Sequence, residues 1–168
     1  MTGFYSEHSK VWVSVDCIVF GFEQDKLKLL IGRRQMDPGR GEWSLYGGFV
    51  GADESLTEAA QRVLTEMTGL NKIYMRQVGA FGDIDRDPGD RVISVAYCAP
   101  INLKDYDDSL REKFGLEWVP VDKLPKLYSD HNKMVKDALS MLRRHINTEP
   151  LSFNLLPPLF TLTQLQHV

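Results

Sequence analysis

The chain has 168 residues, of which 43% are hydrophobic, and a formal net charge of −3. This length and apolar content suit a single domain with a core of ordinary size. The acidic balance argues against the basic surface of a free-standing nucleic-acid binder, and the longest apolar stretch, near CIVFGF, is too short to span a membrane.

Two strands open the chain. Residues 11–22 and 27–34 are rich in β-branched and aromatic side chains, and the polar segment between them predicts a hairpin. The next loop, QMDPGRGE, contains an Asp-Pro-Gly turn signal and leads into a short extended piece, WSLYGGFV. Cys17 and Cys98 lie in separate apolar runs. We expect buried free thiols, which suit a reducing cytoplasm, rather than a disulfide or a metal pair.

A helix follows the glycine-rich piece. Ser55 with Glu58 three residues later is a capping box, which starts the helix, and Gly69 suits the left-handed residue that ends it. Apolar residues recur between these ends at helical spacing, namely at Leu56, Ala60, Val63, Leu64 and Met67. The spacing by itself describes an ordinary amphipathic core helix.

The second half of the chain alternates again between strands and helices. Strands are predicted over residues 72–82 and 91–99, joined by the charged loop DIDRDPGD, and a short strand at EWVPV. The polar segment 105–113 is predicted to be irregular, and residues 129–145 form an amphipathic helix.

The polar residues of the helix after GGFV resemble the Nudix box, G-x5-E-x7-R-E-U-x-E-E-x-G-U, where U is a bulky aliphatic residue. The positions in register are Gly48, Glu54, Arg62, Leu64, Glu66, Gly69 and Leu70. The preceding GEWSLYGG resembles the family's G-x-W-x-L-P-G-G, with tyrosine where proline is usual. The resemblance covers roughly residues 10–146 and implies an α/β (α+β) Nudix fold, a mixed β-sheet sandwiched between helices.

The departures from the box bear on the chemistry. In active members three glutamates collect divalent ions on the diphosphate of the substrate, and these positions hold Val63, Glu66 and Met67 here. One carboxylate makes a poor site for magnesium, which prefers several oxygen ligands. We therefore expect no catalytic residues, no cofactor and no metal site, with Glu66 the one metal ligand if any.

Other carboxylates leave an alternative open. Magnesium-dependent hydrolysis of a nucleoside diphosphate derivative stays the rival prediction if further acidic side chains reach the site, the candidates being Asp53, Glu58, Asp83, Asp85 and Asp87. A third reading is a dimerisation module with an empty cleft.

A small-molecule cleft is predicted at the strand ends. Asp83, Asp85 and Arg91 form one wall, and the opposite wall comes from Arg33, Glu42, Trp43 and Tyr46. Clustered charges beside an aromatic ring suit a sugar. The plainer readings are a solvated loop and a tryptophan that packs in the core.

The segment R-D-P followed by R-V-x-S-V-A-Y resembles the Nudix-related bacterial transcriptional regulators. In these proteins a Nudix-like domain senses ADP-ribose-type ligands or a pentose such as arabinose, and a following winged helix binds DNA. The resemblance implies a small-molecule effector, a homodimer, and DNA binding through a C-terminal domain, with no membrane partner.

The end of the chain fits the same resemblance. We divide the chain into a Nudix-like domain, 1–146, and a segment, 147–168, that holds a linker and the truncated start of a winged helix. Thr161 and Gln164 form a second capping-box pattern near the end. A docked C-terminal tail is the alternative.

Overall fold

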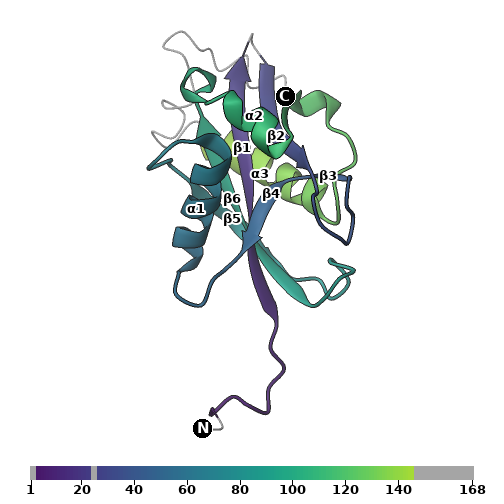
Figure 1. Cartoon of the computed structure of the whole chain (residues 1–168). Helices are drawn as coiled ribbons and strands as arrows, with labels where there is room; N and C mark the ends of the chain where they lie inside the picture. Colours follow the sequence, from purple (N-terminus) through teal and green to yellow (C-terminus); the bar gives the residue numbers. More distant parts are fainter. Residues whose placement is uncertain (1–2, 24–25, 146–168) are drawn as a thin grey trace.

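A seven-stranded mixed sheet lies at the centre of the molecule. The computed structural model describes residues 3–23 and 26–145 (Figure 1). The elements in chain order are β1 (Trp12–Glu23), β2 (Lys26–Arg33), β3 (Trp43–Ser44), β4 (Tyr46–Phe49), α1 (Leu56–Thr68), β5 (Arg76–Phe81), β6 (Val92–Ile101), the 3-10 helix η1 (Leu103–Asp105), α2 (Ser109–Phe114), β7 (Leu116–Pro120), the 3-10 helix η2 (Val121–Lys123) and α3 (His131–His145).

Strand β1 is the central strand of the sheet. It runs parallel to β6 and antiparallel to β2 and β4, so the sheet is mixed. The strand order is β3-β2-β1-β6-β5, with β4 paired to β1 and β7 paired to β2. The predicted hairpin of β1 and β2 is confirmed by the antiparallel register of Phe20 with Leu29.

Helices cover both faces of this sheet. Because successive side chains of a strand point to opposite faces, β1 contributes to two cores. Ile18 and Phe20 pack in a cluster with the apolar side of α3, whereas Cys17 and Val19 pack with that of α1. The predicted Nudix fold, a mixed sheet between helices, is confirmed (Figure 1).

Helix α1 has the predicted ends. Ser55 and Glu58 form the reciprocal capping box, and Gly69 ends the helix in the left-handed conformation with a φ of 71°. The two free cysteines are buried, as predicted. Burial raises the pKa of the Cys98 thiol to about 12 and also raises the pKa of Cys17, so both thiols stay protonated.

The prediction for residues 105–113 was wrong. The segment holds the end of η1 and most of α2. Leu110 and Phe114 stand four residues apart and therefore on one face of α2, and Gly115, with a φ of 61°, ends the helix. Six charged residues in this stretch hid that spacing.

The remaining differences between prediction and structure concern the residues at which elements begin. Strand β5 starts at Arg76 rather than at residue 72, and α3 starts at His131 rather than at 129. Segment 147–168 lies outside the described residues. Within the described part of the chain, no helix has both the length and the apolar character needed to cross a membrane.

Candidate functional site

The surviving residues of the box brace the loop before α1. Arg62 makes two hydrogen bonds with Glu54, from Nε to Oε2 at 3.0 Å and from Nη2 to Oε1 at 2.6 Å. The same arginine donates to the carbonyl of Phe49 at 3.1 Å, and Glu54 accepts from the amide of Gly51 at 2.8 Å. The Arg62 hydrogen bonds, followed by that of Gly51, lower the pKa of Glu54 to about 2. These residues fix the backbone between β4 and α1.

The box positions that carry metal ligands in active relatives do not fit a magnesium ion here. Val63 and Met67 are 1% and 0% exposed and belong to the core beneath α1. Glu66 is exposed and lies 3.8 Å from Arg62. Magnesium requires several oxygen ligands in octahedral geometry, and two of the three side chains offer none.

Three of the other candidate carboxylates have partners of their own. Glu58 is held in the capping box, Asp83 faces Lys133 at 4.0 Å, and Asp87 accepts the amide of Gly89. Among the residues that the structure describes, no three His, Cys, Asp or Glu side chains lie close enough together to hold a metal.

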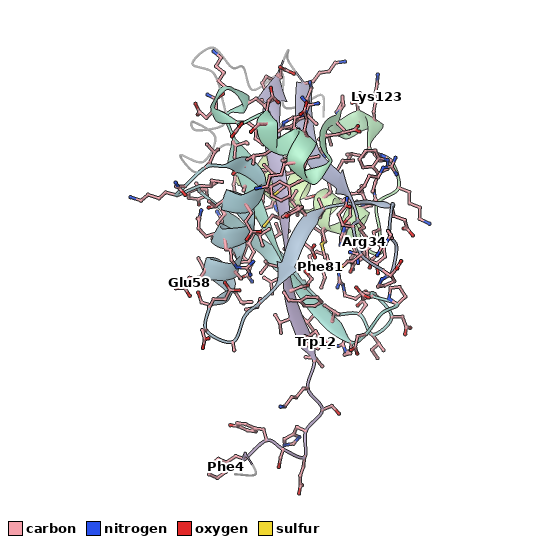
Figure 2. All side chains as sticks on the ribbon, viewed as in Figure 1. Phe4, Trp12, Arg34, Glu58, Phe81 and Lys123 are labelled. Atoms are coloured by element: carbon pink, nitrogen blue, oxygen red, sulfur yellow. The ribbon has the colours of Figure 1, made fainter. Side chains whose placement is uncertain are left out.

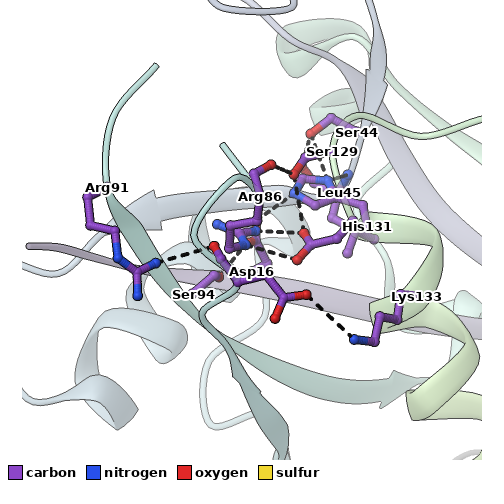
Figure 3. Close-up of polar contacts among 11 residues, drawn as sticks. Asp16, Ser44, Leu45, Arg86, Arg91, Ser94, Ser129, His131 and Lys133 are labelled. Atoms are coloured by element: carbon purple, nitrogen blue, oxygen red, sulfur yellow. Dashed lines mark hydrogen bonds and ion pairs between the residues drawn. The ribbon is translucent and has the colours of Figure 1, made fainter. Parts of the chain in front are cut away.

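A cleft of about 360 Å³, here called cleft A, opens beside β1 and β4. The buried side chains of Asp16 and His131 form its floor (Figure 3). Asp16 accepts a hydrogen bond from the hydroxyl of Ser94 at 2.5 Å, and its other oxygen lies 3.7 Å from Nε2 of His131. The lining residues used below are Trp12, Asp16, Arg34, Phe49, Arg86 and His131.

The protonation of His131 follows from its surroundings. Nδ1 accepts a hydrogen bond from the amide of Leu45 at 3.2 Å, so the proton of the neutral ring sits on Nε2 and faces Asp16. Burial lowers the pKa of His131, although the charges of Asp16 and Asp130 act to raise it. The floor of cleft A therefore offers a donor and an acceptor side by side, a pair that suits a hydroxyl group.

Arg86 ties the charged loop to the start of α3 (Figure 3). Its side chain is 4% exposed and makes two hydrogen bonds with Asp130, from Nε at 2.9 Å and from Nη2 at 2.8 Å. Its carbonyl accepts the hydroxyl of Ser129. Burial acts to raise the pKa of Asp130, but the hydrogen bonds and charge of Arg86 outweigh it, and the pKa is lowered.

A second cleft of about 560 Å³, cleft B, lies between the end of β2 and helix α2. It is cationic, with Arg33, Arg34 and Lys113 against Glu112, and Tyr46 packs edge-on against Phe114 within it. Arg34 lines both clefts. Its guanidinium lies over the ring of Tyr128 at 4.0 Å and its Nε donates to the carbonyl of Pro38 at 2.8 Å.

Two exposed aromatic rings form the mouth of cleft A. Trp12 and Phe49 are 56% and 51% exposed, and their ring centroids lie 5.5 Å apart with a tilt of 58°. The indole Nε1 of Trp12 donates to Asp90 at 2.9 Å. We call Trp12 and Phe49 the aromatic rim; Figure 2 labels Trp12 at the lower end of the sheet.

The predicted ligand-binding residues fall into two groups. Arg33 and Tyr46 line cleft B. Trp43 lies beneath the guanidinium of Arg33, 3.6 Å away, and packs against the core, while Glu42 is exposed.

The other predicted wall lies outside both clefts. Asp83 and Asp85 are exposed, and Arg91 donates to the carbonyl of Asp83 at 3.3 Å. Their roles in binding stay predictions.

Sequence reasoning missed the floor of cleft A. Asp16 interrupts the apolar run VSVDCIVF, and this break in the strand pattern was a usable signal. Nothing local marks Ser94 or His131 as its neighbours. The parallel pairing of β1 with β6 and the position of α3 bring them together.

Comparison with known proteins gives matches that run across nearly the whole chain. It is 34% identical over 167 residues to the "ADPR responsive transcriptional repressor NtrR" of Acinetobacter baylyi, an alignment that covers 97% of this chain and 67% of that protein. It is 36% identical over 130 residues to the "ADP-ribose pyrophosphatase" of Methanocaldococcus jannaschii, with 76% and 72% covered.

Among solved structures, NrtR of Shewanella oneidensis superposes with a TM-score of 0.81 at 28% identity, over 93% of this chain and 75% of that one. NrtR has also been solved with a 27mer DNA, and its NUDIX domain with ADP ribose. Residues 10–138 match the NUDIX domain family. The chain therefore belongs to the NUDIX family and resembles its Nudix-related transcriptional regulators.

Proposed function

We propose that the chain is the ligand-sensing domain of a transcriptional regulator that binds an ADP-ribose-type effector without hydrolysing it. Two clefts that meet at Arg34 hold the effector, cleft A with its hydroxyl-binding floor and cleft B with its cationic lining. A diphosphate needs cations and a ribose needs paired donors and acceptors, and the two clefts supply these separately.

The observation that carries the proposal is the burial of Val63 and Met67 in the core beneath α1, while clefts A and B are both present. A hydrolase needs metal there to neutralise the diphosphate and to activate water. Aliphatic packing at both positions removes the ligands but leaves the clefts intact. Binding without turnover is the behaviour that a sensor requires.

The alternatives make different predictions about ligands. Relatedness to an ADP-ribose pyrophosphatase favours a magnesium-dependent hydrolase as the second candidate. A pentose such as arabinose would satisfy Asp16 and His131 on the floor of cleft A but would leave the cations of cleft B without a partner. The charge of cleft B therefore favours the ADP-ribose-type effector.

Binding is tested by thermal unfolding of the chain with ADP-ribose and with arabinose. A ligand at about 100 times its Kd stabilises the fold by about 2.7 kcal/mol, which raises Tm by about 5–10 °C for a chain of this size. Arg34→Gln should abolish the ADP-ribose shift. Arg143→Gln, which changes an exposed arginine near the end of α3, should keep it. A shift with arabinose alone would reject the nucleotide-type effector.

Hydrolysis is tested in the same samples with magnesium present. Intact ADP-ribose after prolonged incubation agrees with the sensor, whereas magnesium-dependent release of AMP would establish the hydrolase. In the regulator, this domain acts in the cytoplasm as part of a dimer, and the DNA contacts come from a winged helix that follows it. A gel shift on DNA upstream of the gene, with and without ADP-ribose, tests the response of the complete protein.

A further inference from the structure

The aromatic rim of cleft A has no role in the chemistry described so far. Trp12 and Phe49 expose more than half of their surface, although they line the entrance of a cleft with a polar, buried floor. Exposed aromatic surface beside a cleft marks a binding surface rather than a packing accident. The question is which part of a ligand these rings contact.

Hydrogen bonds position the indole ring of Trp12 and the backbone of Phe49, and the two rings contact each other. Asp90 accepts the indole N–H of Trp12 and also the backbone amide of Arg91 at 2.7 Å. Arg62 fixes the carbonyl of Phe49, and β4 pairs Phe49 with Ser14 of β1. Because both rings are positioned before any ligand arrives, little conformational entropy is lost when a planar group stacks on them.

Charge decides which group suits the rim. Asp90 accepts the indole N–H of Trp12 at the rim, and its carboxylate would repel a phosphate placed there. The buried Asp16 and His131 on the floor suit hydroxyl groups, whereas the rim offers only ring faces. Of the three parts of a nucleotide sugar, the rim therefore fits the planar, uncharged base.

We propose that Trp12 and Phe49 form a nucleobase subsite that gives the effector site its preference for a base-bearing ligand over a free sugar. The inference rests on the proposed function and adds an orientation to it. The base stacks at the mouth of cleft A, its ribose reaches toward Asp16 and His131, and the diphosphate meets Arg34 where the two clefts join.

The first test is calorimetric titration of the chain with ADP-ribose and with ribose 5-phosphate. Since stacking of a base on an aromatic side chain is lost on substitution, Phe49→Leu should weaken ADP-ribose binding by about tenfold or more. The affinity for ribose 5-phosphate should stay the same. Phe4→Leu is the matched control, because Phe4 is fully exposed on the N-terminal arm, and it should change neither affinity.

The second test follows tryptophan emission. Stacking on Trp12 should quench the emission of the unaltered chain when ADP-ribose is added. In Trp12→Phe the quenching should disappear while ADP-ribose affinity stays within about threefold, because a phenyl ring still stacks. This comparison decides the matter if ribose 5-phosphate binds too weakly for titration.

The outcomes separate the subsite from the proposed function. If the unaltered chain does not bind ADP-ribose, the effector class itself is wrong. If it binds ADP-ribose and Phe49→Leu binds equally well, only the subsite is overturned. Equal losses for both ligands, or a changed molecular mass of Phe49→Leu in solution, would assign the rim to folding or to contact between copies and would also overturn it.

Discussion

Replacing Arg86 by methionine should destabilise the protein more than any ordinary surface change. The substitution keeps the apolar stem but removes the two hydrogen bonds to Asp130, whose side chain is 18% exposed. Removing one partner of a buried ion pair costs about 3–5 kcal/mol. The partial exposure of Asp130 places the expected loss at the lower end, about 3 kcal/mol, which lowers Tm by about 6–12 °C.

Urea unfolding of four proteins measures this interaction: the unaltered chain, Arg86→Met, Asp130→Asn and the double variant. Because the double variant leaves no unpaired buried charge, its loss should be smaller than the sum of the two single losses. Arg111→Met is the matched control. Its pair with Asp108 is exposed, 45% and 80%, and its removal should cost at most about 0.5 kcal/mol.

The difference between Arg86→Met and the unaltered chain should also depend on pH. The pKa of Asp130 is lowered from its ordinary value of 3.8 in the folded state. Stability from the charged pair is therefore present above pH 3.8 and is lost as the pH falls through the lowered value. A difference that stays constant from neutral pH to pH 2, or strictly additive single losses, would refute this account.

Three further changes test the helix and the thiols. The double variant Val63→Glu and Met67→Glu should lower the free energy of unfolding, measured in urea, by several kcal/mol, because both positions are buried. Magnesium-dependent turnover of ADP-ribose by the unaltered chain at about 1 per second would contradict the view that these positions bind no metal. Cys17 and Cys98 should not react with an aromatic disulfide reagent until denaturant is added, since burial raises both pKa values; fast reaction of the native protein would show an open core. The Tm of Glu54→Gln should fall below that of the unaltered chain by less at pH 2 than at pH 6. The reason is that the pKa of Glu54, lowered from 4.5 to about 2 in the folded state, contributes stability that is present above pH 4.5 and is lost toward pH 2. A Tm difference that grows in acid would show this sign to be wrong.

Features set by neighbours along the chain could be predicted from the sequence. The ends of α1 follow from Ser55, Glu58 and Gly69, because a capping box and a left-handed glycine act within one turn. The ion pair of Glu54 and Arg62 joins residues only eight positions apart, one in the loop before α1 and one within it. The box register therefore gave both the fold and the local structure of α1.

The binding clefts depend on distant contacts and could be predicted only in part. Arg33 and Tyr46 were identified because they flank one loop between neighbouring strands. The floor of cleft A combines Asp16 from β1 with His131 from α3, and Ser94 from β6 holds Asp16 from behind. Their proximity is a product of strand pairing and helix packing, which no spacing along the chain encodes.

Helix α3 belongs to the site at one end only. Its first residue, His131, lies on the floor of cleft A, and its last turn carries Arg143 and Arg144. Fifteen residues at 1.5 Å each place these ends about 22 Å apart along one stiff rod. Arg86 holds Asp130, just before the rod, at the cleft, and Met141 and Leu142 pack the other end into the core. A ligand that displaces His131 would therefore have to move the whole helix as one body, so that occupancy of cleft A is felt at Arg143 and Arg144.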